Sequence, residues 1–188
     1  MYDFDNDGWR DLFVALSHFP ALERYLGRAA PLANRVFRNI GGRRFEDVSA
    51  GAGADFQTPA LHHGTAFADF DNDGRVDAVV TTLEGPVKLF RNVTAGAGHW
   101  LAVRLKGTTS NRQGLGAVVR VTLPDGRTLY GEATTSVGYA SSSEPLVRFG
   151  LGLNAHVKQV EVRWPGGGVQ KLGDVKADRI LEIEEARR

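Results

Sequence analysis

The 188-residue sequence contains no cysteine, which excludes disulfide bonds and cysteine-ligated metal sites. This absence does not identify the compartment, because a secreted protein need not use disulfides. No apolar run is long enough to span a bilayer, and the first residues lack the basic segment followed by an apolar segment that is typical of a signal peptide.

A strong net charge is also missing. The sequence has 23 basic and 22 acidic residues, a formal net charge of +1. This balance gives no electrostatic reason to expect binding to nucleic acid or to an anionic membrane. The hydrophobic content of 42% is enough for a folded core, so the composition excludes a disordered chain.

The acidic residues are concentrated in two similar segments, DFDNDGWRD (residues 3–11) and DFDNDGRVD (residues 69–77). An apolar stretch follows each one, LFVAL or AVVTT, and then a second stretch that ends in FRN. Each unit therefore predicts a strand, an acidic loop, a strand, a turn and a further strand. Short strands with glycine-rich turns in a repeated order favour β-propeller-like blades or a related repeat fold.

The first unit differs from the second in two ways. It has an insertion within residues 19–33, where apolar residues at helical spacing predict a short amphipathic helix. It also has only two residues before its acidic segment, too few for a lead-in strand. We therefore expect the chain to be the C-terminal part of a longer protein, with any targeting signal in the missing part. Gly41 and Gly42 predict a tight hairpin turn after the first FRN.

Both acidic segments have the pattern D-x-D-x-D-G-x-x-D. It supplies side-chain oxygens at positions 1, 3, 5 and 9, a backbone carbonyl at position 7, and a glycine at position 6 for the sharp turn around an ion. Such all-oxygen ligation favours Ca²⁺ over Mg²⁺, which keeps its waters. We expect two Ca²⁺ ions, one in each segment, and the candidate ligands are Asp3, Asp5, Asp7, Trp9, Asp11, Asp69, Asp71, Asp73, Arg75 and Asp77.

An EF-hand is the main competing interpretation, but it requires a glutamate at position 12, where this sequence has Val14 and Val80. Two acidic surface turns without an ion are the simpler alternative. If the dissociation constant is about 10⁻⁴ M, as in weak extracellular sites, millimolar calcium stabilises each loop by about 1.4 kcal/mol. That magnitude favours a structural role for the ion.

The sequence changes character near residues 92–99, which predicts one domain at residues 1–94 and a second at 95–188. Alternating segments at 99–107, 117–123, 146–152, 157–164 and 180–185, with turns at 124–127 and 165–168, predict an antiparallel β-sandwich. The fold class is therefore all-β: partial propeller-like blades followed by a sandwich.

Other polar features are less specific. His62 and His63 form a metal site only with a third convergent ligand, so a place in a strand is the simpler interpretation. The polar loops at 107–114 and 134–144 are either ordinary hairpin loops or, with Tyr139 as an aromatic face, a site for a sugar or peptide. No serine lies in a G-x-S-x-G elbow, and no catalytic residue or organic cofactor is expected.

The repeated DFDNDG segments, with RFEDVSAGAG between them and LFRN after the second, resemble the FG-GAP/VCBS repeats of integrin-α-like β-propellers. In that family the corresponding aspartates bind calcium in loops between blade strands. HWLAVRLKGTTSNRQGLGAVVRV, SVGYASSSE, RFGLG and VEVRWPGGGVQ resemble, in this order, the ASPIC/UnbV domain of cartilage acidic protein-like proteins. The resemblance implies an extracellular location and no established catalytic activity.

These features together predict a calcium-binding, non-enzymatic interaction or adhesion module. We expect an extracellular, periplasmic or cell-surface location and a glycan or protein ligand, with no nucleic acid and no membrane span. The alternative is the C-terminal part of a secreted enzyme or enzyme accessory protein, whose active site lies in the missing N-terminal region.

Overall fold

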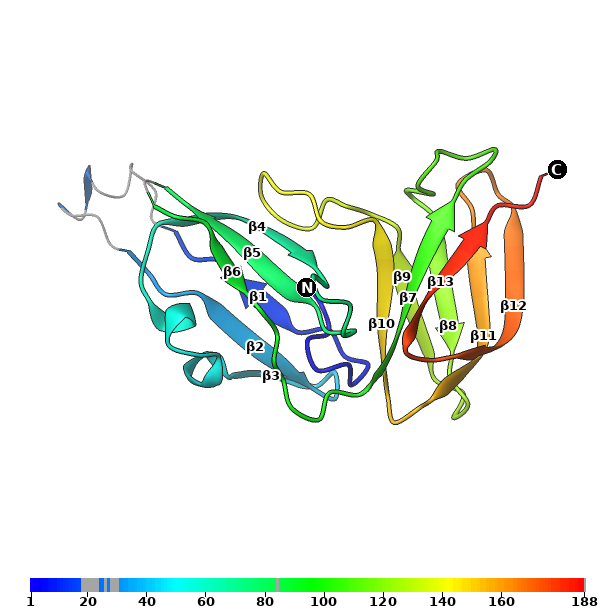
Figure 1. Cartoon of the computed structure of the whole chain (residues 1–188), viewed down its shortest axis with the longest axis horizontal. Coiled ribbons are helices and arrows are strands. Elements are labelled where there is room, and N and C mark those ends of the chain that lie inside the picture. The colour runs from blue at the N-terminus through cyan, green and yellow to red at the C-terminus, as the bar shows by residue number, and fades with distance from the viewer. Residues whose placement is uncertain (18–23, 26, 28–30, 84, 188) are drawn as a thin grey trace.

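The computed structural model describes residues 1–17, 24–25, 27, 31–83 and 85–187, and the chain is all-β, as predicted (Figure 1). The helix expected within residues 19–33 falls mostly outside the described residues and stays a prediction. Among the described residues, no helix is long and apolar enough to cross a membrane.

The first part of the chain, called here the repeat region, contains two three-stranded antiparallel sheets. The two sheets have the orders β1-β2-β3 and β4-β5-β6. The strands are β1 (Leu12–Val14), β2 (Arg35–Ile40), β3 (Arg44–Asp47), β4 (His62–Ala68), β5 (Asp77–Thr82) and β6 (Lys88–Phe90).

The second repeat has the expected order of strand, acidic loop, strand, turn and strand, in β4, β5 and β6. In the first repeat the lead-in strand is reduced to a single bridge, in which the Asp11 backbone N–H donates to the Tyr2 carbonyl at 2.7 Å. The predicted hairpin is present between β2 and β3, and Gly41 and Gly42 have φ angles of 60° and 73° there.

Two short 3₁₀ helices, η1 (Ser49–Gly51) and η2 (Asp55–Gln57), connect the two sheets of the repeat region. Phenylalanine rings from the two sheets and from η2 contact one another. Phe13 meets both Phe56 and Phe67 edge-on, with ring centroids 5.5 Å apart in each pair, and Phe56 meets Phe90 at 5.3 Å. Edge-to-face pairs at these separations are favourable beyond the apolar area that they bury. The aromatic contacts therefore fix the two repeats against each other.

The second part is a β-sandwich of seven strands, and is called the sandwich below. One sheet has the order β10-β7-β13 and the other has the order β12-β11-β8-β9. Apolar side chains that alternate along both sheets form one core, in which Trp164 is 2% exposed. The strands are β7 (His99–Lys106), β8 (Val118–Thr122), β9 (Thr128–Glu132), β10 (Leu146–Gly152), β11 (His156–Arg163), β12 (Val169–Lys176) and β13 (Arg179–Glu184).

The expectation of a fully antiparallel sandwich is wrong for one pair of strands. β13 runs parallel to β7, with Arg179 opposite Leu101 and Glu184 opposite Lys106. After β12 the chain crosses to the other sheet and reaches β7 from the same end at which β7 begins. The alternation of apolar and polar residues along β13 determines which face is buried, but it does not encode the direction of the neighbouring strand.

Candidate metal sites

The two acidic segments form two loops, which are called the first loop (residues 3–11) and the second loop (residues 69–77). In each loop the structure brings three of the four aspartates together. Their carboxylate oxygens lie within 4.8 Å of one another, and the two groups are Asp3, Asp5 and Asp11 and Asp69, Asp71 and Asp77. These are the aspartates at positions 1, 3 and 9 of the predicted calcium pattern.

The fourth aspartate of each loop, at position 5, lies outside these groups. The Asp7 carboxylate accepts a hydrogen bond from the Trp9 backbone N–H at 2.8 Å, and Asp73 accepts one from the Arg75 backbone N–H at 2.9 Å. These contacts form a tight turn within each loop. Ligation by these two aspartates, and by the carbonyls at position 7, stays a prediction.

The first aspartate of each loop holds the loop backbone. Asp3 accepts hydrogen bonds from the backbone N–H groups of the residues four and five positions later, at 3.1 and 2.7 Å. Asp69 does the same, at 3.1 and 2.9 Å. The repeated motif therefore produces the same local structure twice, even though the surroundings differ.

The last aspartate connects each loop to its repeat and is only 2% exposed in both cases. Asp11 accepts backbone N–H groups from the loop's second residue at 2.8 Å and from Asn39 at 2.8 Å. Asp77 accepts the equivalent groups, from the second residue of its own loop at 2.9 Å and from Asn92 at 2.6 Å. Position 9 therefore joins the acidic loop to the strand that ends in FRN.

Both loops need left-handed backbone at two positions. Asn6 and Asn72 have φ angles of 57° and 60°, and Gly8 and Gly74 have φ angles of 96° and 87°. Asparagine and glycine adopt this conformation most easily, which explains why both loops contain the letters NDG.

Three asparagines that the sequence did not identify as functional join the parts of the two sites. The Asn6 side chain donates to the Gly74 carbonyl at 3.2 Å, so it connects the first loop to the second. Asn92 donates to the Phe4 carbonyl at 2.8 Å, a second connection between them. Asn39 donates to the Arg10 carbonyl at 3.0 Å, which connects β2 to the first loop. For Asn39 and Asn92, the repeated FRN was the available signal in the sequence.

The arginine of each FRN faces an aspartate of its own loop. Arg38 Nε lies 2.6 Å from Asp5 Oδ2, and Arg91 lies 2.6 Å from Asp71 Oδ2. Half or more of each arginine side chain is exposed, so each ion pair contributes little stability by itself. These arginines balance only part of the negative charge.

In the first loop, burial and charge crowding change the acidity of the aspartates. Burial, followed by repulsion from Asp7, Asp5 and Asp11, raises the pKa of Asp3 to about 8, against the opposing hydrogen bond from Gly8. Burial also raises the pKa of Asp11 to about 6. A bound cation would offset this repulsion, and the oxygen-only donor set suits a hard divalent ion. The residues present therefore fit a Ca²⁺ ion.

The second loop has more positive charge close to its carboxylates. Although desolvation opposes the shift, the Arg91 guanidinium lowers the pKa of Asp71 below its ordinary value. Arg148 from β10 of the sandwich reaches within 3.5 Å of Asp69, whose side chain is only 2% exposed. Arg75 pairs with Asp73. The two loops thus share their internal contacts but have different electrostatic surroundings.

Other candidate residues have structural contacts. His62 is fully buried in β4, and the His63 ring meets the Tyr139 ring edge-on at 5.1 Å. Neither histidine belongs to a group that could hold a metal; in the described ranges, groups of three or more metal-ligating side chains occur only in the two loops. The simpler interpretation of the histidines as strand residues fits these contacts.

The polar loop at residues 107–114 is held by one carboxylate. Glu185 accepts the backbone N–H groups of Thr108, Thr109 and Ser110 at 3.0, 2.9 and 2.7 Å, and the Ser110 hydroxyl at 2.9 Å. The hydrogen bond from the Ser110 backbone is the largest cause that lowers the pKa of Glu185 to about 2. Glu185 is therefore ionised at neutral pH, and it gives this loop a structural role.

Two family models match the two parts of the chain. Residues 3–80 match the family model of the FG-GAP-like repeat, and residues 107–188 match that of ASPIC and UnbV. Cartilage acidic protein 1 from Xenopus tropicalis is 28% identical over 193 residues, and the mouse and human proteins are 28% identical over 194 residues. Each alignment covers 96% of this chain and 27% of the relative, so the chain spans about a quarter of their length. The predicted resemblance is thus confirmed: the first part of the chain is similar to FG-GAP-like repeats and the second part to the ASPIC/UnbV domain.

Proposed function

We propose that each loop binds one Ca²⁺ ion and that the chain is a calcium-stabilised, non-enzymatic interaction module of an extracellular protein. The observation that carries the proposal is the equivalence of the two loops. In both, carboxylates from positions 1, 3 and 9 converge, and the same backbone N–H groups hold them. Two turns that were acidic only by chance would have no reason to share these contacts.

The position of the loops favours a structural role for the ions. The first loop precedes β1, an edge strand of its sheet, and the second loop precedes β5, the central strand of its sheet. Each loop is also hydrogen-bonded to the FRN segment of its own repeat. The ion would therefore hold three segments of one repeat together. At a dissociation constant of about 10⁻⁴ M, millimolar calcium contributes about 1.4 kcal/mol for each loop.

The interaction role is supported by the similarity to known families, and contacts within the chain account for the two polar loops of the sandwich. The similarity to cartilage acidic protein 1 suggests an extracellular location, and FG-GAP repeats suggest a protein ligand. The two polar loops of the sandwich, which had been candidates for ligand binding, make contacts within the chain at Glu185 and at β4. We therefore propose that the repeats of the full-length protein, and not these two loops, bind the partner, which is an extracellular protein or a glycan.

Calcium titration of the chain by isothermal calorimetry tests the metal sites. We expect two bound ions, and one fewer in Asp5→Ala and in Asp71→Ala. Asp125→Ala is the matched control, because Asp125 lies in an exposed turn of the sandwich and contacts Arg127. The proposal fails if calcium gives no binding heat and leaves the Tm unchanged. A binding screen against extracellular glycans and matrix proteins, with and without chelator, tests the interaction role.

A further inference from the structure

Both loops face the sandwich, and they form much of the junction between it and the repeat region (Figure 1). The first loop is attached through its backbone. The Asp5 carbonyl accepts the Gly98 N–H at 2.9 Å, and the Asn6 carbonyl accepts the Gly152 N–H at 2.8 Å. These carbonyls belong to adjacent residues in the middle of the loop, so a change in loop conformation would break both contacts.

The packing at this junction leaves no space for a side chain at several glycines. A Cβ atom on Gly150 would lie 2.0 Å from Asp3 Oδ2, and one on Gly98 would lie 2.5 Å from the Asn6 carbonyl oxygen. On the second loop, a Cβ atom on Gly74 would lie 1.9 Å from the Trp100 indole nitrogen. The sandwich therefore packs directly against the backbone of both loops, with no space for a side chain at these glycines.

The second loop is attached through a buried charge. Arg148, with 10% of its side chain exposed, lies 3.5 Å from Asp69 and also pairs with Glu144 at 2.5 Å. Its guanidinium lies over the Trp100 ring, 5.9 Å from the centroid. A positively charged group of the sandwich thus contacts a predicted ligand of the second ion.

A third contact lies beside the loops. The segment 134–145 of the sandwich extends along β4 (Figure 1), where the Phe67 N–H donates to Ser143 Oγ at 3.0 Å and the Glu144 N–H donates to the Phe67 carbonyl at 3.3 Å. Val137 packs on the apolar cluster of the repeats. Phe67 is two residues before the second loop, so these contacts between segment 134–145 and β4 lie next to the second candidate metal site.

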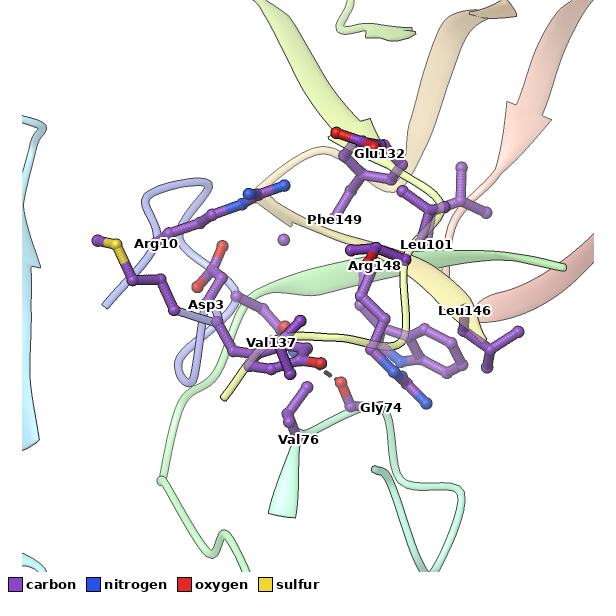
Figure 2. Close-up of a pocket in the computed structure, with 17 residues that line it drawn as sticks. Asp3, Arg10, Gly74, Val76, Leu101, Glu132, Val137, Leu146, Arg148 and Phe149 are labelled. Carbon is purple, nitrogen blue, oxygen red and sulfur yellow. Dashed lines mark hydrogen bonds between the residues drawn. The ribbon is translucent and has the colours of Figure 1, made fainter. Parts of the chain in front are cut away.

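Between these contacts is a small cavity of about 80 Å³. Figure 2 shows Asp3 and Arg10 of the first loop on one side of it and Leu146 and Arg148 of β10 on the other, with Gly74 below. The Asp3 carboxylate is therefore close to β10 of the sandwich.

From these contacts we infer that calcium in the two loops controls the docking of the sandwich on the repeat region. With ions bound, the loops keep the conformation that accepts Gly98, Gly152 and Arg148, and the chain is one rigid body. Without ions, repulsion among the clustered carboxylates displaces the loop backbone, and the sandwich moves relative to the repeats. This inference rests on the proposed calcium sites.

A pair of spin labels tests the inference in the full chain. The protein has no cysteine, so Leu89→Cys on β6 and Val169→Cys on β12 provide two unique labelling sites. Both positions are exposed, by 64% and 50%, and lie in different parts of the molecule. We expect a narrow distribution of label–label distances with calcium and a broad one with chelator, measured by pulsed electron spin resonance.

The possible outcomes separate the inference from the proposed function. If calcium binds with two ions per chain but the distance distribution is the same with and without it, docking is independent of calcium and the inference is wrong. If calorimetry shows no binding, the calcium sites themselves are wrong, and the inference falls with them. Narrowing of the distribution as the two sites fill supports both.

Gly98→Ala tests the same coupling by weakening the docking and measuring calcium affinity. The added Cβ atom would meet the Asn6 carbonyl and Gly152, not a carboxylate. Coupling between sites is reciprocal, so weaker docking must weaken calcium binding. We expect the calcium affinity to fall by about fivefold or more. Gly173→Ala is the control, because a Cβ atom there meets nothing within 4 Å. Equal affinities in the two variants would contradict the inference.

If Gly98→Ala does not fold, Ser143→Ala weakens the junction at Phe67, away from the carboxylates. Its control is Ser142→Ala, at the exposed neighbouring serine of the same segment. The inference requires a lower calcium affinity and a broader distance distribution in Ser143→Ala than in Ser142→Ala. No difference between them would overturn it.

Discussion

The first and second loops have equivalent internal hydrogen bonds but different charge environments. The carboxylate of Asp3 is buried beside three other aspartates, and its pKa rises to about 8. In the second loop, Arg91 lowers the pKa of Asp71, and Arg148 lies against Asp69. The motif alone determines the shape of each loop, whereas residues outside the motif determine its charge balance.

Two loops with the same motif therefore need not bind an ion in the same way. The first loop is more unfavourable when empty, because its carboxylates repel one another and, among the described residues, only Arg38 forms ion pairs with them. The second loop is partly neutralised by arginines before any ion binds. We therefore expect calcium to compete mainly with protons at the first loop and mainly with arginines at the second.

Removal of calcium should have the largest effect. With about 1.4 kcal/mol lost for each loop, chelation should lower the Tm by about 6–12 °C for a chain of this size. Asp5→Ala and Asp71→Ala should each keep about half of this calcium-dependent shift, which thermal unfolding with and without calcium measures. If one variant loses the whole shift, the two loops do not bind calcium independently.

Neutralising the first aspartate of each loop should change the stability of the calcium-free protein in opposite directions. At pH 9, where Asp3 is ionised in the empty loop, Asp3→Asn removes a buried, repelled charge and should stabilise the empty chain by at least about 1 kcal/mol, the equivalent of one pKa unit. Asp69→Asn removes a partner of the buried Arg148 and should destabilise it by about 1 kcal/mol. Urea unfolding in chelator measures both changes, and shifts of the same sign would contradict the comparison.

Calcium binding should depend on pH at the first loop. Its ligands must be ionised, so below pH 8 one proton at Asp3 competes with the ion, and the affinity should fall about tenfold for each pH unit. Near pH 6 Asp11 adds a second proton to the competition. Asp71, with its lowered pKa, stays ionised over this range.

Calorimetry of the single-loop variants at pH 6, 7 and 8 measures this dependence. Asp71→Ala, which keeps the first loop, should show the steep loss of affinity, and Asp5→Ala, which keeps the second, should show a shallower one. The ionisation of Asp3 also makes the stability of the calcium-free protein depend on pH. Because the pKa of Asp3 is raised, its contribution is present below about pH 4 and is lost as the pH rises through 8.

Removing an FRN arginine should have the smallest effect. Arg38→Gln and Arg91→Gln each free an aspartate that the ion also uses, so calcium affinity should rise, by less than about fivefold for such exposed pairs. The increase should be larger for Arg91→Gln if arginines are the main competitors at the second loop. A fall in affinity would show that the arginines position the aspartates for the ion.

The sequence predicted the all-β fold, the two repeats and four candidate aspartate ligands in each loop, of which three converge in the structure, because these features depend on local periodicity and spacing. Asn6 and Arg148 could not be predicted as site residues. Asn6 acts through a contact with Gly74, 68 positions away, and Arg148 comes from the other part of the chain. The parallel pairing of β13 with β7 was missed for the same reason, since strand direction is a property of the complete topology.

The parallel pair of β7 and β13 has a mechanical consequence. The chain enters the sandwich at the start of β7 and leaves it at the end of β13, so tension applied across the sandwich would pull these two neighbouring strands in opposite directions along their length. The evenly spaced hydrogen bonds of a parallel pair then bear the load together and cannot open one at a time. A tether attached after β13 would therefore act on the most resistant direction of the fold.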